Sequence, residues 1–309
     1  MALTINTNLS SMIVQSNLNK STNQLNQAIE RMTTGYKINH AADNAAGYSI
    51  ARNWEAKLGS LDVAADNAAT GADMLSTLED HYALISSHVQ RVRDLTEQAA
   101  NGTYGKQSRD AIESEIKARL EEINRIATNC EFNDIALMAG ATPQATSGLD
   151  IQVGTDSSAT KSQIHLDKEL FANGNVVELF SGGDYVVPTS TETDKDKKVA
   201  DITAKIAKDC AGNGTVEGGA AKMLDHIDKV INKISGRITT LGAAQNRIES
   251  AIESIGVQSE NITSSLSTLR DADVATESSN YIKAQILQQA SATLLATANQ
   301  SPSIALNLL

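Results

Sequence analysis

The stretch that decides the fold is residues 227–273, which read IDKVINKISGRITTLGAAQNRIESAIESIGVQSENITSSLSTLRDAD. The seam residues recur there at steps that alternate between four and three, and eleven of the fourteen positions are isoleucine or leucine. This spacing is the heptad pattern of a helix that packs along partner helices. At ~1.5 Å per residue the predicted helix is roughly 70 Å long. The positions are Ile227, Ile231, Ile234, Ile238, Leu241, Gln245, Ile248, Ile252, Ile255, Ser259, Ile262, Leu266, Leu269 and Asp273.

Two segments of the N-terminal half supply candidate partner helices. Residues 78–99 repeat the alternation of four and three, and residues 112–127 repeat it over a shorter length. The turn signal Asn101-Gly102 separates them. Three helices with matching apolar faces predict a bundle in which both halves of the sequence meet. The apolar faces comprise Leu78, Tyr82, Ile85, Val89, Val92, Thr96 and Ala99, and then Ile112, Ile116, Leu120, Ile123 and Ala127.

The two ends of the chain carry weaker versions of the same pattern. The C-terminal helix is predicted to stop before Pro302, because proline interrupts helical hydrogen bonding. Ordering the backbone costs ~1–2 kcal/mol per residue, and each buried apolar side chain returns only ~1.5–3 kcal/mol. We therefore expect each end to stay unfolded until it finds neighbours. The pattern comprises Val14, Leu18, Leu25, Ile29, Met32 and Tyr36 near the N-terminus, and Ile282, Ile286, Ala290, Leu294 and Ala298 near the C-terminus.

The middle of the chain differs in composition and period. Apolar residues alternate over 149–153 and 164–166, which predicts a β-hairpin. Residues 182–219 are rich in Gly, Thr, Asp and Lys, with one short helix predicted over Val199–Cys210. The predicted fold is mainly α: an elongated discontinuous helical bundle or coiled coil with a small β-hairpin region and a short central insert.

Composition excludes several classes of protein. Lys and Arg total 26 against 37 Asp and Glu, which gives a net charge of -11, so the basic footprint of a nucleic-acid-binding protein is absent. The sequence contains no run of ~18 apolar residues, so it predicts no membrane span. Residues 1–14 lack the basic and apolar regions of a signal peptide, so any export is expected to use a route that does not read one.

The sequence predicts no catalytic, metal or cofactor site. His81 and His88 are seven residues apart, whereas a metal pair on one helical face needs a spacing of three or four. Cys130 and Cys210 are expected to be free thiols, with a bond between them as the less favoured alternative. The polar seam residues Gln245 and Ser259 are either accidents or devices that fix helix register. Asp273 is interpreted as a helix junction.

Motifs near both ends resemble those of bacterial flagellin. They occur in the family's order, and the resemblance covers roughly residues 1–175 and 220–309. The chain departs from the family pattern at Cys130, where cysteine is unusual, and in its small central insert. The motifs are Ile5–Asn8, Leu18–Ser21, Ala28–Gly35, Ala42–Gly47, Gln90–Leu95, Phe132-Asn133, Leu241–Glu249, Arg270–Asp273, Gln285–Ala290 and Ala298–Gln300.

The resemblance implies a division of the chain and a function. Residues 1–43 and 267–309 would form an inner coiled-coil domain, and residues 44–175 with 220–266 an outer helical rod domain that includes the hairpin. Residues 176–219 would be a variable surface insert. The protein would not be an enzyme. It would be a structural subunit that polymerises into the flagellar filament for motility, secreted unfolded through the flagellar type III apparatus to the extracellular flagellum, with its termini folding on assembly.

The resemblance also implies partners. Besides copies of itself, the chain would meet a flagellar export chaperone at its C-terminal helix, a filament cap protein and a hook–filament junction protein. A vertebrate toll-like receptor would recognise the protein in innate immunity. The main alternative is that the chain is itself a hook–filament junction protein; an exported flagellin-like enzyme or a membrane-contacting type III translocator fits the sequence less well. The receptor positions are Gln90, Arg91, Leu95, Glu115 and Arg119.

Overall fold

A computed structural model describes residues 8–138, 147–156, 158–181, 195–214 and 219–306. The chain divides into two compact units. Met1–Gly59 and Gln258–Leu309 make up the terminal unit, and Ser60–Val257 make up the central unit. The two ends of the sequence therefore belong to the same compact unit.

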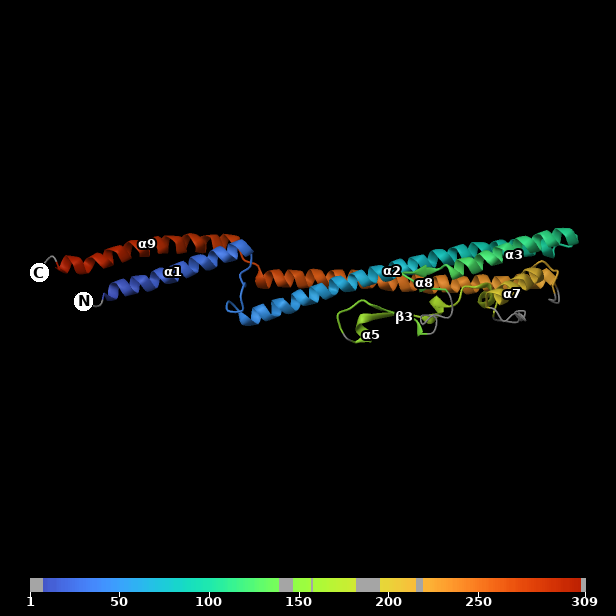
Figure 1. Cartoon of the computed structure of the whole chain (residues 1–309), viewed down its shortest axis with the longest axis horizontal. Coiled ribbons are helices and arrows are strands. Elements are labelled where there is room, and N and C mark those ends of the chain that lie inside the picture. Colours follow the sequence, from blue (N-terminus) through green and yellow to red (C-terminus); the bar gives the residue numbers. More distant parts are fainter. Residues whose placement is uncertain (1–7, 139–146, 157, 182–194, 215–218, 307–309) are drawn as a thin grey trace. The chain divides into compact units, whose positions relative to one another are not determined.

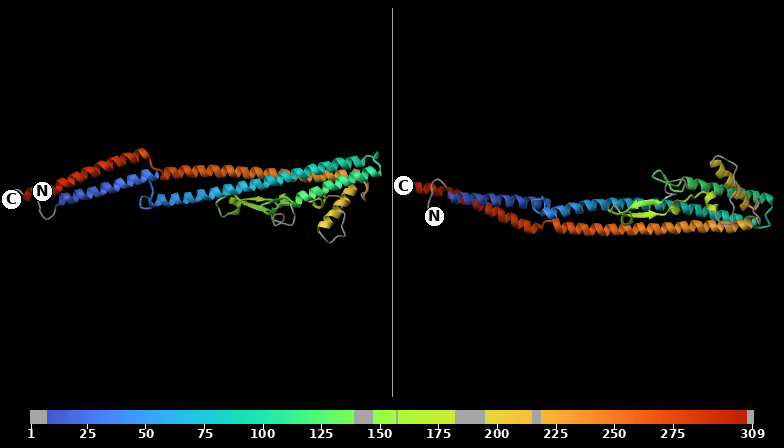
Figure 2. Two further views of the ribbon diagram at one scale, coloured as in Figure 1. Left: turned by 45° about the horizontal axis from the view of Figure 1, so that its top comes forward. Right: turned by 90° about the horizontal axis from the view of Figure 1, so that it is seen from below.

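The terminal unit is built on a pair of antiparallel helices. Helix α1 (Leu9–Thr34) and helix α9 (Val274–Leu306) lie side by side in every view (Figures 1 and 2). The Asn8 side chain caps α1 by accepting a hydrogen bond from the Ser11 N–H, and Gly35 ends the helix with a φ of 75°. Asp273 begins α9 by accepting from the Ala275 N–H at 2.9 Å.

The prediction that the C-terminal helix stops before Pro302 is wrong, because α9 continues to Leu306. Proline has no N–H, so it leaves the carbonyl oxygen of Ala298 without its helical donor. The side-chain amide of Asn8 donates to this oxygen at 2.7 Å. A residue at the other end of the sequence thus replaces the missing hydrogen bond, which lets the helix pass through the proline.

Two long helices contribute residues to both units. Helix α2 spans Ala45–Ala100 and helix α8 spans Gly219–Arg270, so the long helix predicted from the heptad pattern is confirmed. Helix α8 ends directly before the predicted junction at Asp271–Asp273. There the Ala272 N–H donates to the Gly35 carbonyl at 2.8 Å, which ties the end of α1 to the start of α9.

In the central unit α2, α8 and α3 (Lys106–Thr128) surround one apolar core. The predicted faces of α2 and α3 are buried. On α8 the core contains the predicted Ile227, Ile234, Leu241 and Ile248, with Val230 and Ala244 between them, and Arg237 is buried on the same face. Ile231, Ile238 and Ile252 pack partly buried beside it, Ile255 is also buried, and Ile262, Leu266 and Leu269, in the terminal unit, are half-buried. The buried face of α8 is therefore wider than one heptad seam, as a helix with two partners requires.

The predicted β-hairpin is confirmed. Strand β3 (Leu149–Gln152) pairs antiparallel with β4 (Gln163–Leu166), and Ile151 faces Ile164 across the pair. The four-residue helix α5 (Ala159–Ser162) lies in the connection. Ile151 contacts α2 at Gly71, where an added Cβ would lie 2.5 Å from the Ile151 Cδ1 atom.

A second hairpin was not predicted from the sequence. Strands β1 (Glu131–Phe132) and β2 (Ile135–Ala136) are joined by Asn133 and Asp134, whose φ values are 49° and 62°. Two consecutive residues with positive φ are typical of the tight turn that suits strand twist, and Asn and Asp tolerate this conformation. The strands are too short to show alternation in the sequence.

Three short helical segments follow β4. They are the 3₁₀ helix η1 (Lys168–Phe171), α6 (Val176–Phe180) and α7 (Lys195–Cys210), and α7 confirms the short helix predicted there. Helices α6 and α7 pack onto α3, and the Tyr82 hydroxyl of α2 donates to the Leu170 carbonyl of η1 at 3.1 Å. Phe171, Phe180, Ile206 and Cys210 join the apolar core. The helical parts of the central insert therefore bury one face rather than standing free in solvent.

Candidate assembly surface

Large apolar side chains are exposed mainly in the terminal unit. Among described residues, twelve of the sixteen exposed large apolar side chains belong to it, although it is the smaller unit. Exposed apolar patches of this kind mark sites of protein–protein or membrane interaction. The twelve are Leu9, Met12, Ile13, Ile29, Met32, Tyr36, Ile50, Val274, Ile282, Ile286, Leu287 and Leu294.

Helix α9 turns its polar and small residues toward α1 and its large apolar residues outward. Its buried residues include Glu277, Ala284 and Ser291, which are spaced seven apart. Ile282, Ile286 and Leu294, the residues that the sequence pattern singled out, are 52%, 59% and 57% exposed. With Leu287, these three define what we call the outer row of α9. Within the described part of the terminal unit, these side chains keep more than 40% of their surface exposed.

Helix α1 has a related arrangement. Ser21 and Ala28, again seven residues apart, are buried, and Val14, Leu18 and Leu25 lie half-buried beside them. The other predicted residues, Ile29 and Met32, are exposed. The two helices are thus joined mainly through small side chains, whose burial returns less free energy than that of isoleucine or leucine.

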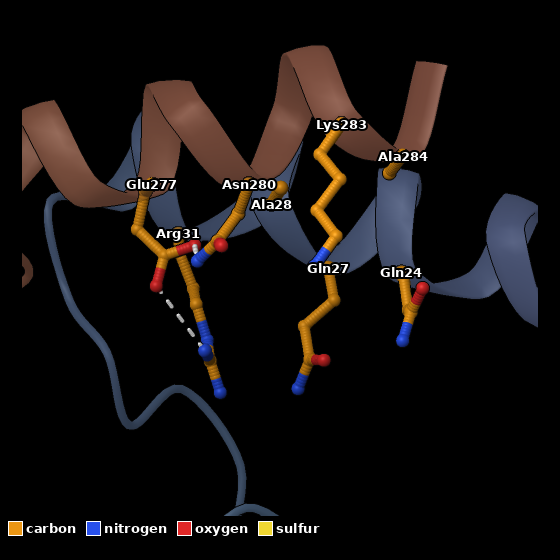
Figure 3. Close-up of a pocket in the computed structure, with 8 residues that line it drawn as sticks. All are labelled: Gln24, Gln27, Ala28, Arg31, Glu277, Asn280, Lys283 and Ala284. Carbon is orange, nitrogen blue, oxygen red and sulfur yellow. Dashed lines mark hydrogen bonds and ion pairs between the residues drawn. The ribbon is translucent and has the colours of Figure 1, made fainter. Parts of the chain in front are cut away.

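A polar pocket of about 220 Å³ lies between α1 and α9 (Figure 3). Arg31 Nη1 lies 3.3 Å from Glu277 Oε1, and Asn280 donates to the other Glu277 oxygen at 3.4 Å. In the view of Figure 3, Lys283 extends from α9 toward Gln27 of α1. The ion pair between Arg31 of α1 and Glu277 of α9 fixes the register of the two helices. The residues that line the pocket include no acid–base or nucleophile pair.

The connection from α1 to α2 is held by one carboxylate and one guanidinium. Asp43 accepts hydrogen bonds from the backbone N–H groups of His40 and Asn39, and the bond from His40 is the main cause of its lowered pKa. The guanidinium of Arg270 lies 4.0 Å from the centre of the Tyr36 ring and forms an ion pair with Glu55. These contacts, all within the terminal unit, position the start of α2.

The structure brings together some of the predicted receptor residues. Arg91 Nε and Nη2 donate to Glu115 Oε1 at 3.0 and 2.9 Å, and Arg119 lies 3.9 Å from the same oxygen. Gln90 is exposed on α2. Leu95 is only 2% exposed and belongs to the apolar core. Four of the five side chains are thus accessible, and three of them form one charged cluster.

The described part of the chain contains no group of three or more His, Cys, Asp or Glu residues that could hold a metal ion. Within it, no helix combines the length and hydropathy needed to cross a membrane. Cys130 and Cys210 are free and buried, and burial raises the pKa of each thiol to about 12. Neither thiol is therefore suited to nucleophilic chemistry.

Two family comparisons match most of the chain. Residues 5–143 match the family described as bacterial flagellin N-terminal helical region, and residues 224–309 match the one described as bacterial flagellin C-terminal helical region. Polar flagellin F of Vibrio parahaemolyticus is 30% identical, and flagellin C of Vibrio cholerae is 31% identical. Each alignment covers 100% of both chains.

A solved structure shares the fold. The putative flagellar hook-associated protein from Vibrio parahaemolyticus superposes with a TM-score of 0.55 at 14% sequence identity. The match covers 74% of this chain and 100% of that one.

Proposed function

This chain belongs to the bacterial flagellin family and is a structural subunit of the flagellar filament, and we propose that it joins the filament through the outer row of α9 and the exposed residues of α1. The observation that supports this most is the exposure of Ile282, Ile286 and Leu294 on a helix whose inner face is polar and small. Flagellins are structural proteins, and the filament that they form is extracellular.

The physics of the proposed contact accounts for a fibre rather than a closed ring. A contact between two different surfaces of the same chain leaves each surface free at one end of the assembly. Copies then add without limit, provided that the rotation between neighbouring copies does not bring the assembly back onto its first copy as a closed ring. Complete burial of a fully exposed large apolar side chain is worth ~1.5–3 kcal/mol, and Ile282, Ile286 and Leu294, which are 52–59% exposed, gain roughly half of this at the contact.

We further propose that the terminal unit acquires its full stability only in the filament. Residues 1–43 and 267–309 then form the inner coiled-coil domain, and residues 44–175 and 220–266 form the outer rod domain. The small residues between α1 and α9 support this, because their burial offsets little of the backbone entropy. Folding coupled to assembly hinders polymerisation inside the cell.

The double substitution I282S/I286S tests the contact. Both side chains are exposed in the free chain, so its helicity and unfolding temperature should stay close to those of the unchanged protein. Elongation of filament seeds, followed by sedimentation and electron microscopy, should fall at least tenfold. V63S is the matched control, because Val63 is equally exposed but lies in the central unit. Normal elongation by the double variant would remove the outer row from the interface.

The same assay separates the filament subunit from the alternative of a hook–filament junction protein. A filament subunit extends seeds into long filaments, whereas a junction protein adds a short layer and stops. The shared fold with a hook-associated protein does not favour that alternative, because the 14% identity reports the fold alone.

For the steps before assembly we propose export of the unfolded chain through the flagellar type III apparatus. An export chaperone would cover the outer row of α9 in the cytoplasm. A cap protein would guide insertion at the tip, and a hook–filament junction protein would receive the first copies. The exposed apolar row supports a chaperone, because such a surface aggregates when left uncovered.

We also propose that a vertebrate toll-like receptor recognises the cluster around Arg91 and Glu115, with Gln90, Leu95 and Arg119. R91A should weaken receptor binding by the monomer at least tenfold, because it removes two charge-assisted hydrogen bonds and an exposed cation. R247A is the control, since Arg247 is also exposed in the central unit. Undiminished binding by R91A would exclude Arg91 from the site.

A further inference from the structure

The central unit contains a second cavity, of about 500 Å³, that filament assembly does not explain. It lies between one face of α8 and the segment from η1 to α6. Leu170 and Ala172 give it an apolar wall, and Glu169, Lys233, Arg237 and Thr240 contribute polar groups. A concave site with an apolar wall and a few polar groups is the usual form of a small-molecule site.

Arg237 is a buried cation that has no anionic partner among the described residues. It occupies a core-facing position of α8 and is only 9% exposed. Its Nη1 atom lies 3.4 Å from the Tyr82 hydroxyl and 3.3 and 3.5 Å from the carbonyl oxygens of Asn173 and Ala172. No carboxylate among the described residues forms an ion pair with it. A buried guanidinium held only by neutral groups favours any anion that can reach it.

The second cation of the cavity is already paired. Lys233 Nζ donates to the Glu178 carbonyl at 2.8 Å and lies 3.8 Å from the Glu178 carboxylate. Burial, followed by the charge of Arg237, lowers the pKa of Lys233. Glu169, by contrast, is exposed and forms no ion pair in the described part of the chain. Among the described residues, the unpaired charged groups of the cavity are therefore one cation, Arg237, and one anion, Glu169.

We propose that this cavity binds a small zwitterion of the amino-acid class, with its carboxylate on Arg237 and its ammonium group facing Glu169. The guanidinium fork matches a carboxylate in a bidentate geometry. A ligand with only a negative charge would leave Glu169 unpaired and would meet two carboxylates in the cavity. A zwitterion adds no net charge, and Leu170 and Ala172 can receive an aliphatic side chain.

Binding of L-leucine to the full-length monomer tests the proposal. We expect saturable binding by calorimetry in about the millimolar range, together with a raised unfolding temperature. Two single-charge analogues, 4-methylpentanoate and isopentylamine, should each bind at least tenfold more weakly. R237L and E169Q should each weaken leucine binding at least tenfold. R247L and E249Q, on the exposed face of α8, should leave it unchanged.

The outcomes separate the proposal from its rivals. Absence of saturable leucine binding overturns it, and so does equal binding of 4-methylpentanoate, which would indicate a site for carboxylates only. Unchanged binding by E169Q also overturns it. If R237L unfolds, R237K replaces it, because lysine keeps the charge but loses the fork and should still weaken binding. The assay uses monomers, so its result is independent of filament growth.

Discussion

At the scale of single residues, the two buried thiols make stability depend on pH. Cys130 and Cys210 have pKa values raised from 9.0 to about 12 by burial. In the unfolded chain they lose protons near pH 9, whereas in the folded chain they keep them until about pH 12. The unfolded state therefore binds fewer protons between these values, and stability is lost as the pH rises through this window.

We accordingly expect the unfolding temperature of the protein to fall more steeply between pH 9 and 11 than that of C130A/C210A. The alanine substitutions also leave small cavities in the core, so the difference in unfolding temperature at pH 7 serves as the baseline. Tyr82, whose pKa is raised chiefly by burial and in smaller part by the charge of Cys130, adds to the slope in both proteins. If the unfolding temperature fell equally steeply with pH in both proteins, burial would not raise the pKa of the thiols.

The hydrogen bond from Asn8 to Ala298 predicts a second effect of single residues. N8A should lower the melting temperature of assembled filaments, because it removes both a helix cap and the donor that replaces the missing N–H of Pro302. In a P302A background the N–H of residue 302 can donate to the Ala298 carbonyl, so N8A should lower the melting temperature less. Thermal melts of the four proteins complete a double-mutant cycle. Strict additivity would contradict the link between the two residues.

At the scale of elements, two glycines in helices should respond differently to a methyl group. G242A should stabilise α8 by up to about 1 kcal/mol, because alanine favours helix and, apart from the backbone of α8 itself, no described atom lies within 4 Å of the added Cβ. G71A should gain less or lose stability, because its Cβ meets Ile151 of β3. Chemical unfolding of the monomer measures both changes.

The substitution I151V supplies the control for G71A. Valine lacks the Cδ1 atom that lies closest to the added Cβ. In that background G71A should recover much of the gain seen with G242A. If I151V changes nothing, the packing of the hairpin against α2 does not limit the substitution.

The regular elements could be predicted from periodicity alone. The heptad pattern predicts α8, the seams of α2 and α3 coincide with their buried faces, and the alternating strands predict β3 and β4. These elements are long enough, or regular enough, for a period to be visible. The β1–β2 hairpin has only two residues in each strand, so no period could reveal it. The passage of α9 through Pro302 depends on Asn8, which is distant in sequence.

The candidate assembly surface could be predicted only in part. The apolar pattern identified Ile282, Ile286 and Leu294, but periodicity does not say which face of a helix lies inside the chain. The inner face of α9 could have been found from the spacing of seven between Glu277, Ala284 and Ser291. It was not predicted, because charged and small side chains rarely define the buried face of a helix. Arg237 was missed for a related reason, since a single charge in an aliphatic seam does not reveal whether it is buried.

At the scale of the whole molecule, the two units should differ in stability. In the monomer, amide hydrogens of α1 and α9 should exchange far faster than those in the core of the central unit, because exchange follows local opening. In filaments the exchange of α1 and α9 should slow by orders of magnitude. Hydrogen–deuterium exchange read by mass spectrometry measures both states.

Deletion variants test the same difference. Removal of residues 1–43 or 267–309 should abolish filaments in electron micrographs while circular dichroism still reports a helical central unit. Normal filaments from either variant, or equal protection of both units in the free chain, would contradict assembly-coupled folding.

The outward-facing row of α9 also sets how much protein remains unassembled. Since Ile282, Ile286 and Leu294 keep more than half of their surface exposed in the free chain, roughly half of their burial free energy is released when a copy adds to the end of the polymer. Every 1.4 kcal/mol so released lowers about tenfold the critical concentration at which growth and loss balance. A residue-by-residue series of smaller side chains along this row should therefore raise that solubility limit in logarithmic steps.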